Sequence, residues 1–183
     1  MYILFHTFFK AGDRKVLIRV IGIGSPFGDD TAGMEVVRML AHEPPATCEL
    51  LIVDRPGASL LDLMEDADAA ILVDAVRSGA RPGTLHPLSF DELIRWTAHL
   101  VSSHELGVAA SIQLARPLGR APARGGLLGV EISPVPSRIP CPPLTRAVQR
   151  AVKRALSRLR LWVRELDASN KHQGTTKLAH GRL

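Results

Sequence analysis

The stretch Val20–Asp30, VIGIGSPFGDD, joins an apolar run to a glycine-containing loop that ends in two acids. An apolar strand followed by a Gly-x-Gly loop is typical of nucleotide-binding folds, because the glycines let backbone N–H groups approach a phosphate at the next helix. Asp29 and Asp30 would repel that phosphate. The stretch therefore predicts an α/β fold whose glycine loop serves something other than an anion.

Runs of strand length recur along the chain and alternate with helical patterns. Strands are expected at 16–23, 49–54, 69–76, 84–89 and 127–132, and helices at 31–40, 59–64, 90–100, 102–115 and 144–166. Apolar strands separated by amphipathic helices predict βαβ units and a parallel sheet. The predicted fold class is α/β, with a mostly parallel twisted sheet of about five strands and helices on both faces.

Length and composition favour a single domain. The 183 residues are 46% hydrophobic and 22% charged, which allows one substantial core. We expect an N-terminal extension at 1–15, one α/β domain at 16–167 and a polar, disordered tail at 168–183.

The two cysteines have no CxxC spacing, which fits a reducing, cytoplasmic location. The apolar opening MYILFHTFF is too short to span a bilayer, so membrane insertion is not expected.

The net charge of +5 is concentrated at the end of the chain. Residues 144–183 hold ten Lys or Arg against two acids, and apolar residues recur there at helical spacing. Such a segment is most often a surface helix with a solvated basic face, and its alternative role is to dock an acidic protein partner. Nucleic acid is not expected as a partner, because only 4% of residues are aromatic and they do not interleave with the basic ones.

Three acids follow the ends of three predicted strands. Asp30 closes the glycine loop, Asp54 ends the second strand, and Asp74 lies in LVDAV at the end of the third. A single Asp after a strand is more often a helix cap or a turn residue. Ligands of parallel sheets, however, bind beyond the carboxyl ends of the strands. The convergence of three acids on that edge therefore favours a binding site.

His104, in SSHELG, adds a nitrogen donor to this set. Ser102 and Glu105 have the spacing of a capping box, which places His104 in the first turn of a helix, where the positive helix end disfavours imidazolium. A neutral histidine is a competent metal ligand. Carboxylates with one imidazole suit a borderline divalent ion such as nickel or zinc. The glycine loop is therefore interpreted as delivering a carboxylate to a cation.

Other chemistries fit these motifs less well. A dinucleotide site would use Gly22, Gly24 and Gly28, but this spacing is one residue longer than GxGxxG. The acid after the second strand, Asp54, lies about 30 residues further on instead of the usual ~20. HELGV lacks the second histidine of a zincin, and the chain has no Gly-x-Ser-x-Gly. A nucleotide-binding oxidoreductase stays open as an alternative, which saturable NAD binding would support.

The glycine loop GIGSPFGDD, the Asp after the second strand, LVDA and SSHELG together resemble the hydrogenase maturation proteases, over roughly 16–166. The resemblance implies an endopeptidase that removes the C-terminal extension of a nickel-loaded [NiFe] hydrogenase large-subunit precursor. It implies that Asp30, Asp74 and His104 contact the nickel, which the substrate contributes, and that no nucleotide is needed. Asp29 and Asp54 are expected around these ligands and not on the metal.

Two loop positions depart from the usual pattern of that family. Ser25 stands where the family usually has Asn, and Thr31 where a glycine often follows the paired acids, whereas Gly33 is retained.

The resemblance leaves open whether the nickel or a carboxylate activates the attacking water. We expect a monomer. The alternative function is a noncatalytic nickel-checkpoint or chaperone-like module for hydrogenase assembly, which would use the same ligands without hydrolysis.

Overall fold

The structure is a computed structural model that describes residues 3–5, 16–96, 103–133 and 143–179, with side chains described at 16–96, 108–133 and 143–169. The strands and helices alternate along most of the chain. In chain order they are β1 (Ile3–Phe5), β2 (Ile18–Gly24), η1 (Gly28–Thr31), α1 (Ala32–Leu40), β3 (Cys48–Asp54), η2 (Gly57–Ser59), α2 (Leu60–Met64), β4 (Ala69–Val76), β5 (Leu85–Ser89), α3 (Phe90–Trp96), α4 (Ser103–Ala115), β6 (Arg124–Glu131) and α5 (Arg146–Ala179).

A six-stranded sheet forms the middle layer, in the order β1-β3-β2-β4-β6-β5. The inner strands β3, β2, β4 and β6 are parallel, whereas the edge strands β1 and β5 are antiparallel to their neighbours. Pro87 lies in β5, and an edge strand is where a sheet tolerates a residue without an N–H group. The predicted α/β fold is confirmed, with one strand more than the hydrophobic runs predict.

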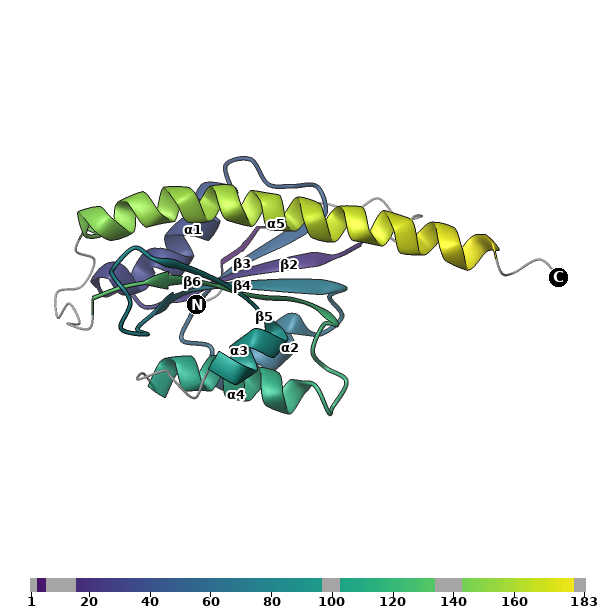
Figure 1. Cartoon of the computed structure of the whole chain (residues 1–183), viewed down its shortest axis with the longest axis horizontal. Coiled ribbons are helices and arrows are strands. Elements are labelled where there is room, and N and C mark those ends of the chain that lie inside the picture. Colours follow the sequence, from purple (N-terminus) through teal and green to yellow (C-terminus); the bar gives the residue numbers. More distant parts are fainter. Residues whose placement is uncertain (1–2, 6–15, 97–102, 134–142, 180–183) are drawn as a thin grey trace.

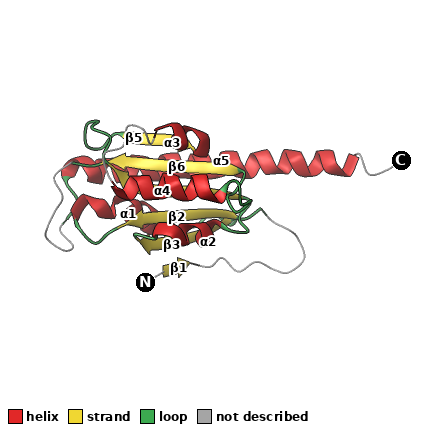
Figure 2. Ribbon diagram, turned by 90° about the horizontal axis from the view of Figure 1, so that it is seen from below, coloured by secondary structure: helices red, strands yellow, loops and turns green. Residues whose placement is uncertain are grey.

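Helices cover both faces of this sheet. Helices α1 and α5 lie on one face and α2, α3 and α4 on the other, as Figures 1 and 2 show. Because side chains alternate along a strand, β4 contributes to two cores. Ile71 and Val73 pack with α1 and α5, whereas Leu72 and Val76 pack with the helices of the opposite face.

Helix α5 extends further than the apolar pattern predicts. Among its described side chains, which reach Ser169, the last buried one is that of Leu166, but its backbone stays helical through Ala179 and projects beyond the sheet (Figure 1). The prediction of a disordered tail from 168 is therefore wrong for residues 168–179. That prediction rests on the loss of apolar periodicity, whereas a helix already nucleated on the core can propagate without further packing. Ser169 also donates its hydroxyl hydrogen to the Glu165 carbonyl, 2.8 Å away.

The segments before β2 and after α3 also differ from the prediction. Ile3–Phe5, within the predicted extension at 1–15, pairs as an edge strand with Leu50–Ile52. The helix predicted at 90–100 is observed as Phe90–Trp96, and 97–102 lie outside the described residues. Among the helices of the described ranges, none combines the length and apolar character needed to cross a membrane.

Candidate functional site

Three acidic residues lie at the carboxyl ends of the neighbouring strands β3, β2 and β4. Asp54, the last residue of β3, is paired with Gly24, the last residue of β2. Asp30 follows β2 in the single-turn helix η1, and Asp74 lies near the end of β4, on the other side of β2. The strand order therefore brings these acids to one edge of the sheet, as the sequence predicts.

The glycines of the loop permit close contact between backbone segments. A Cβ atom on Gly24 would lie 2.3 Å from the carbonyl oxygen of Asp30. A Cβ atom on Gly33, in the first turn of α1, would lie 2.2 Å from the carbonyl oxygen of Val73 and 2.4 Å from that of Ile23. These distances are far below van der Waals contact, so the two glycines seat η1 and α1 directly on the ends of β2 and β4.

The Asp30 carboxylate is held by one hydroxyl and one guanidinium group. The Ser25 hydroxyl donates to Oδ2, and Arg77 Nη2 lies 3.3 Å from Oδ1. Ser25 is buried, whereas the side chains of Asp30 and Arg77 are 26% and 25% exposed. Asp30 therefore stays accessible to a ligand, with a cation from the β4–β5 loop beside it.

Asp54 is exposed and binds the guanidinium group of the next residue. Arg55 Nε and Nη2 lie 2.6 and 3.2 Å from its two carboxylate oxygens. The hydrogen bond to Asp54 raises the pKa of Arg55, with further contributions from the charges of Asp54 and Asp30. The Arg55 backbone is left-handed, with φ of 42°, and its N–H donates to the Gly24 carbonyl at 3.2 Å. This contact ties the end of β3 to the glycine loop.

Asp74 is almost fully buried, with 2% of its surface exposed. Its Oδ1 accepts a hydrogen bond from the Ala75 N–H at 2.8 Å. By the alternation along β4, its side chain lies on the same face as Leu72 and Val76, which is the face that α4 covers. Figure 1 shows α4 running antiparallel to β6, so that α4 begins near the edge where the parallel strands end.

His104 belongs to the first turn of α4, as the sequence predicts, but its side chain lies outside the described residues. Among the side chains that the structure does describe, no three His, Cys, Asp or Glu residues are grouped to hold a metal ion. The assignment of Asp30, Asp74 and His104 as a joint ligand set therefore stays a prediction.

Asp29 has a different partner from its neighbour Asp30. Its two carboxylate oxygens accept hydrogen bonds from the backbone N–H and the hydroxyl of Thr145, at 2.7 and 2.8 Å. Thr145 immediately precedes α5, and its carbonyl accepts the first helical hydrogen bond from Gln149. Asp29 thus anchors the start of α5 beside the glycine loop.

Comparison with known proteins places this fold and edge in a family. The model of the hydrogenase maturation protease family matches residues 34–160. This chain belongs to that family. The matched range includes Asp54, Asp74 and His104 and begins just after the glycine loop. The chain is accordingly an enzyme, an endopeptidase of hydrogenase maturation.

Relatives of the protease include proteins similar in sequence and in structure. The hydrogenase expression/formation protein HupD of Rhodobacter capsulatus is 32% identical, over 79% of this chain and 72% of its own. The hydrogenase 2 maturation protease of Escherichia coli is 29% identical, over 78% of this chain and 90% of its own. The structure of the maturating endopeptidase HybD from E. coli superposes with a TM-score of 0.72 at 29% identity, covering 82% of this chain and 93% of HybD.

The protease also has a buried acid at this edge that the strand-end argument misses. Glu131, the last residue of β6, is 1% exposed. Its Oε1 accepts hydrogen bonds from the N–H groups of Ser78 and Gly79, at 2.9 and 3.0 Å. Its Oε2 lies 2.7 Å from the Ser78 hydroxyl and 2.9 Å from His86 Nε2. Glu131 therefore holds the loop that follows Asp74. The signal in the sequence that could have identified Glu131 is its place as the acid that ends the apolar run LLGVE.

Proposed function

We propose that this protease removes the C-terminal extension of a [NiFe] hydrogenase large-subunit precursor once nickel is in place. In this proposal Asp30, Asp74 and His104 contact the nickel of the substrate. The family supports the peptidase activity on hydrogenase precursors. The observation that carries metal recognition is the pair Asp30 and Asp74, which enter one sheet edge from the ends of two adjacent strands.

The chemistry of this donor set fits recognition of a metal that already has other ligands. Two carboxylates and an imidazole provide oxygen and nitrogen donors, and thiolates, which bind nickel tightly, are absent from the set. The free protease is therefore expected to bind nickel weakly. Nickel held by the thiolates of the substrate would gain the remaining donors from the protease. Docking of the metal then fixes the scissile bond near the edge, and such proximity can contribute several kcal/mol to catalysis.

Arg77 matters to this proposal because its guanidinium group is paired with the Asp30 carboxylate in the absence of substrate. The guanidinium group 3.3 Å from Oδ1 balances the carboxylate charge. A divalent ion that approaches Asp30 competes with this ion pair, which is partly exposed. In the proposal, nickel replaces Arg77 as the partner of the Asp30 carboxylate. The attacking water is activated either by the nickel as a Lewis acid or by a carboxylate as a base.

The proposal is tested by mixing the protease with nickel-loaded and nickel-free precursor and measuring the intact mass of the large subunit. We expect the unaltered protease to shorten only the loaded precursor. Asp30→Asn, Asp74→Asn and His104→Ala should each abolish most cleavage, and double changes should add little because the three act together. Asp62→Asn, which changes an acid 70% exposed on α2, serves as the matched control and should cleave normally.

Two results would contradict parts of the proposal. Near-normal cleavage by Asp74→Asn or His104→Ala would show that these residues do not recognise the nickel. The proposed peptidase activity would still stand. Tight binding of the loaded precursor without any change in its mass would instead support the nickel-checkpoint alternative.

A further inference from the structure

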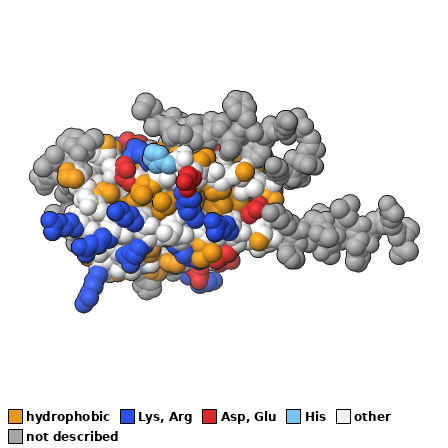
Figure 3. All heavy atoms as spheres, turned by 90° about the horizontal axis from the view of Figure 1, so that it is seen from above, with side chains coloured by type: hydrophobic (Ala, Val, Ile, Leu, Met, Phe, Trp, Pro, Cys, Tyr) orange, Lys and Arg blue, Asp and Glu red, His pale blue; other side chains and the backbone are white. Residues whose placement is uncertain are grey.

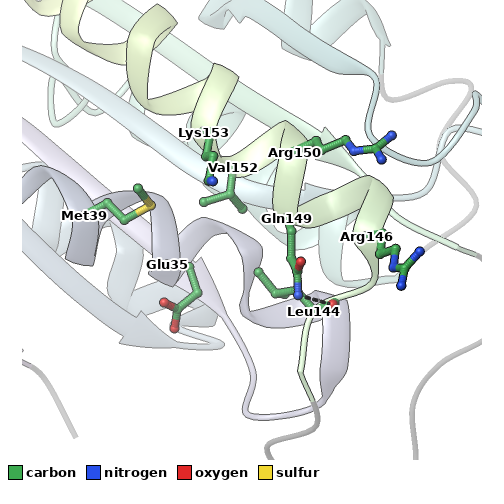
Figure 4. Close-up of a pocket in the computed structure, with 8 residues that line it drawn as sticks. All are labelled: Glu35, Met39, Leu144, Arg146, Gln149, Arg150, Val152 and Lys153. Carbon is green, nitrogen blue, oxygen red and sulfur yellow. Dashed lines mark hydrogen bonds between the residues drawn. The ribbon is translucent and has the colours of Figure 1, made fainter.

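A groove of about 450 Å³ lies between α1 and α5, on the face opposite α4. Its floor is apolar and consists of Met39, Leu144 and Val152, which pack on the core below. Figure 4 shows Met39 on α1 pointing toward Val152 of α5, with Arg146 and Arg150 of α5 extending outward at the rim. The groove therefore combines an apolar base with a charged margin.

The charged margin is basic, and its three cations form a single stripe. Arg146, Arg150 and Lys153 lie at positions i, i+4 and i+7 of α5, which places them on one side of the helix. All three are exposed, and none has a carboxylate within ion-pair distance among the described residues. The one acid of the lining, Glu35, is already paired with Arg38 of α1. The groove thus presents positive charge that the described part of the chain does not neutralise.

Three other basic residues of α5 differ in this respect. Arg158 pairs with Glu165, Arg160 pairs with Glu43, and Arg154 donates to the Gly83 carbonyl. Figure 3 shows Lys and Arg side chains gathered over this face, with hydrophobic side chains between them. Of the four exposed basic residues of α5 with neither an ion pair nor a side-chain hydrogen bond in the described part of the chain, three therefore cluster beside the groove, and the fourth, Arg164, lies further along the helix.

One end of the groove adjoins the candidate metal site. Leu144 lines the groove, and the next residue, Thr145, is bound by both carboxylate oxygens of Asp29. Asp29 precedes Asp30 in the chain. One end of the groove therefore lies beside Thr145 and Asp29, and Asp29 is the chain neighbour of the proposed nickel ligand Asp30.

We infer that this groove binds an acidic, amphipathic segment of the hydrogenase large-subunit precursor. The inference rests on the proposed function. The stripe spans about 10 Å along α5, so the segment would carry carboxylates over that length and apolar side chains that reach the floor. Opposite charges across such a surface speed the encounter and fix the register of the partner, whereas the apolar floor supplies contact that does not depend on salt.

The test measures kcat and KM for cleavage of nickel-loaded precursor at low ionic strength. Combining Arg150→Glu with Lys153→Glu should raise KM roughly tenfold and leave kcat unchanged, because the groove binds substrate without entering the reaction. Raising the salt concentration should raise KM of the unaltered protease and change that of the variant little. Arg164→Glu is the control, since Arg164 is exposed on α5 about 16 Å further along the helix than Lys153.

A second pair of variants tests the apolar floor. Met39→Gln should raise KM about threefold at every salt concentration, whereas Leu161→Gln should not, because Leu161 is 50% exposed on α5 outside the groove. Thermal melting of each variant separates a binding defect from lost stability. The inference is wrong if KM is unchanged in the charge-reversed variant. It is also wrong if the charge-reversed variant binds random-sequence DNA more weakly than the unaltered protease does but binds and cleaves the precursor equally well.

The failure of this inference can be distinguished from the failure of the proposed function. If the unaltered protease does not cleave the loaded precursor, the proposed function fails, and the dissociation constant of the two proteins then tests the groove directly. A tenfold weaker dissociation constant for the charge-reversed variant would support the groove in that case, and an equal one would overturn it.

Discussion

Replacement of Glu131 tests how strongly one buried carboxylate organises the edge of the sheet. Glu131 accepts four hydrogen bonds from the loop and strand that follow Asp74. The same loop carries Arg77, which contacts Asp30. Glu131→Ala should therefore lower both the stability of the fold and the activity of the site, although the partners of Glu131 are Ser78, Gly79 and His86 and none of these is a proposed nickel ligand.

The expected loss can be worked out from these contacts. A hydrogen bond to a charged acceptor contributes roughly 1.5–3 kcal/mol, and contacts that share one acceptor are not additive. With two N–H groups left without their acceptor beside a cavity, Glu131→Ala should cost about 3–5 kcal/mol. Glu131→Gln keeps the volume and one carbonyl oxygen for the Ser78 and Gly79 N–H groups, so it should cost about 1–2 kcal/mol. For a chain of this size, the alanine variant should melt roughly 10 °C lower.

Thermal melting, cleavage of loaded precursor and hydrogen exchange form the assay. Exchange at the Ser78 and Gly79 amides should be much faster in Glu131→Ala than in Glu131→Gln, because only the alanine variant frees both amides. Glu92→Ala is the control: Glu92 also accepts two hydrogen bonds, both from Ser89, but it is exposed and should change the melting temperature little. The reasoning is refuted if Glu131→Ala melts within 2 °C of the unaltered protease or leaves exchange at these two amides unchanged.

Three further predictions concern the loop, the thiol and the tail. Gly24→Ala should destabilise the fold by about 1–3 kcal/mol in chemical denaturation, because its Cβ atom would overlap the carbonyl oxygen 2.3 Å away. Burial raises the pKa of the Cys48 thiol to about 12, so in a Cys141→Ser background Cys48 should resist alkylation at pH 8 and react fully once unfolded. Truncation after Ser169 should leave the melting temperature unchanged, because residues 170–183 have no periodic apolar pattern and Leu166 is the last buried side chain among those described on α5. A large drop would show that the outer turns stabilise the domain.

Most of the fold can be predicted from the sequence because its strands are continuous apolar runs. Buried parallel strands such as β4, with all eight residues buried, leave no ambiguity about where a strand lies. Strand β1 is not predicted, because three residues are too short for a periodic pattern and they pair only through tertiary contact with β3. The outer turns of α5 are not predicted either, because they are helical without the periodic apolar residues that the prediction requires.

The site is predictable only as far as topology determines it. The carboxyl ends of parallel strands bring Asp54 and Asp74 to one edge, and the parallel arrangement follows from the βαβ pattern. The different partners of Asp29 and Asp30 cannot be predicted, because Asp29 binds Thr145, which is 116 residues away in the chain. Glu131 is missed for the same reason, since its partners lie 45 to 53 residues before it.

The acidic glycine loop can now be explained in physical terms. In a nucleotide-binding fold, loop glycines leave backbone N–H groups free to bind a phosphate. Here the space that Gly24 and Gly33 leave is filled by carbonyl oxygens of the same chain, so the glycines pack η1 and α1 against the strand ends. The acidic end of the loop is therefore suited to a cation and not to an anion. In this structure the cation beside Asp30 is the guanidinium group of Arg77. Because the pair with Arg77 is partly exposed, Asp30 stays accessible, as the proposed recognition of a metal-bearing substrate requires.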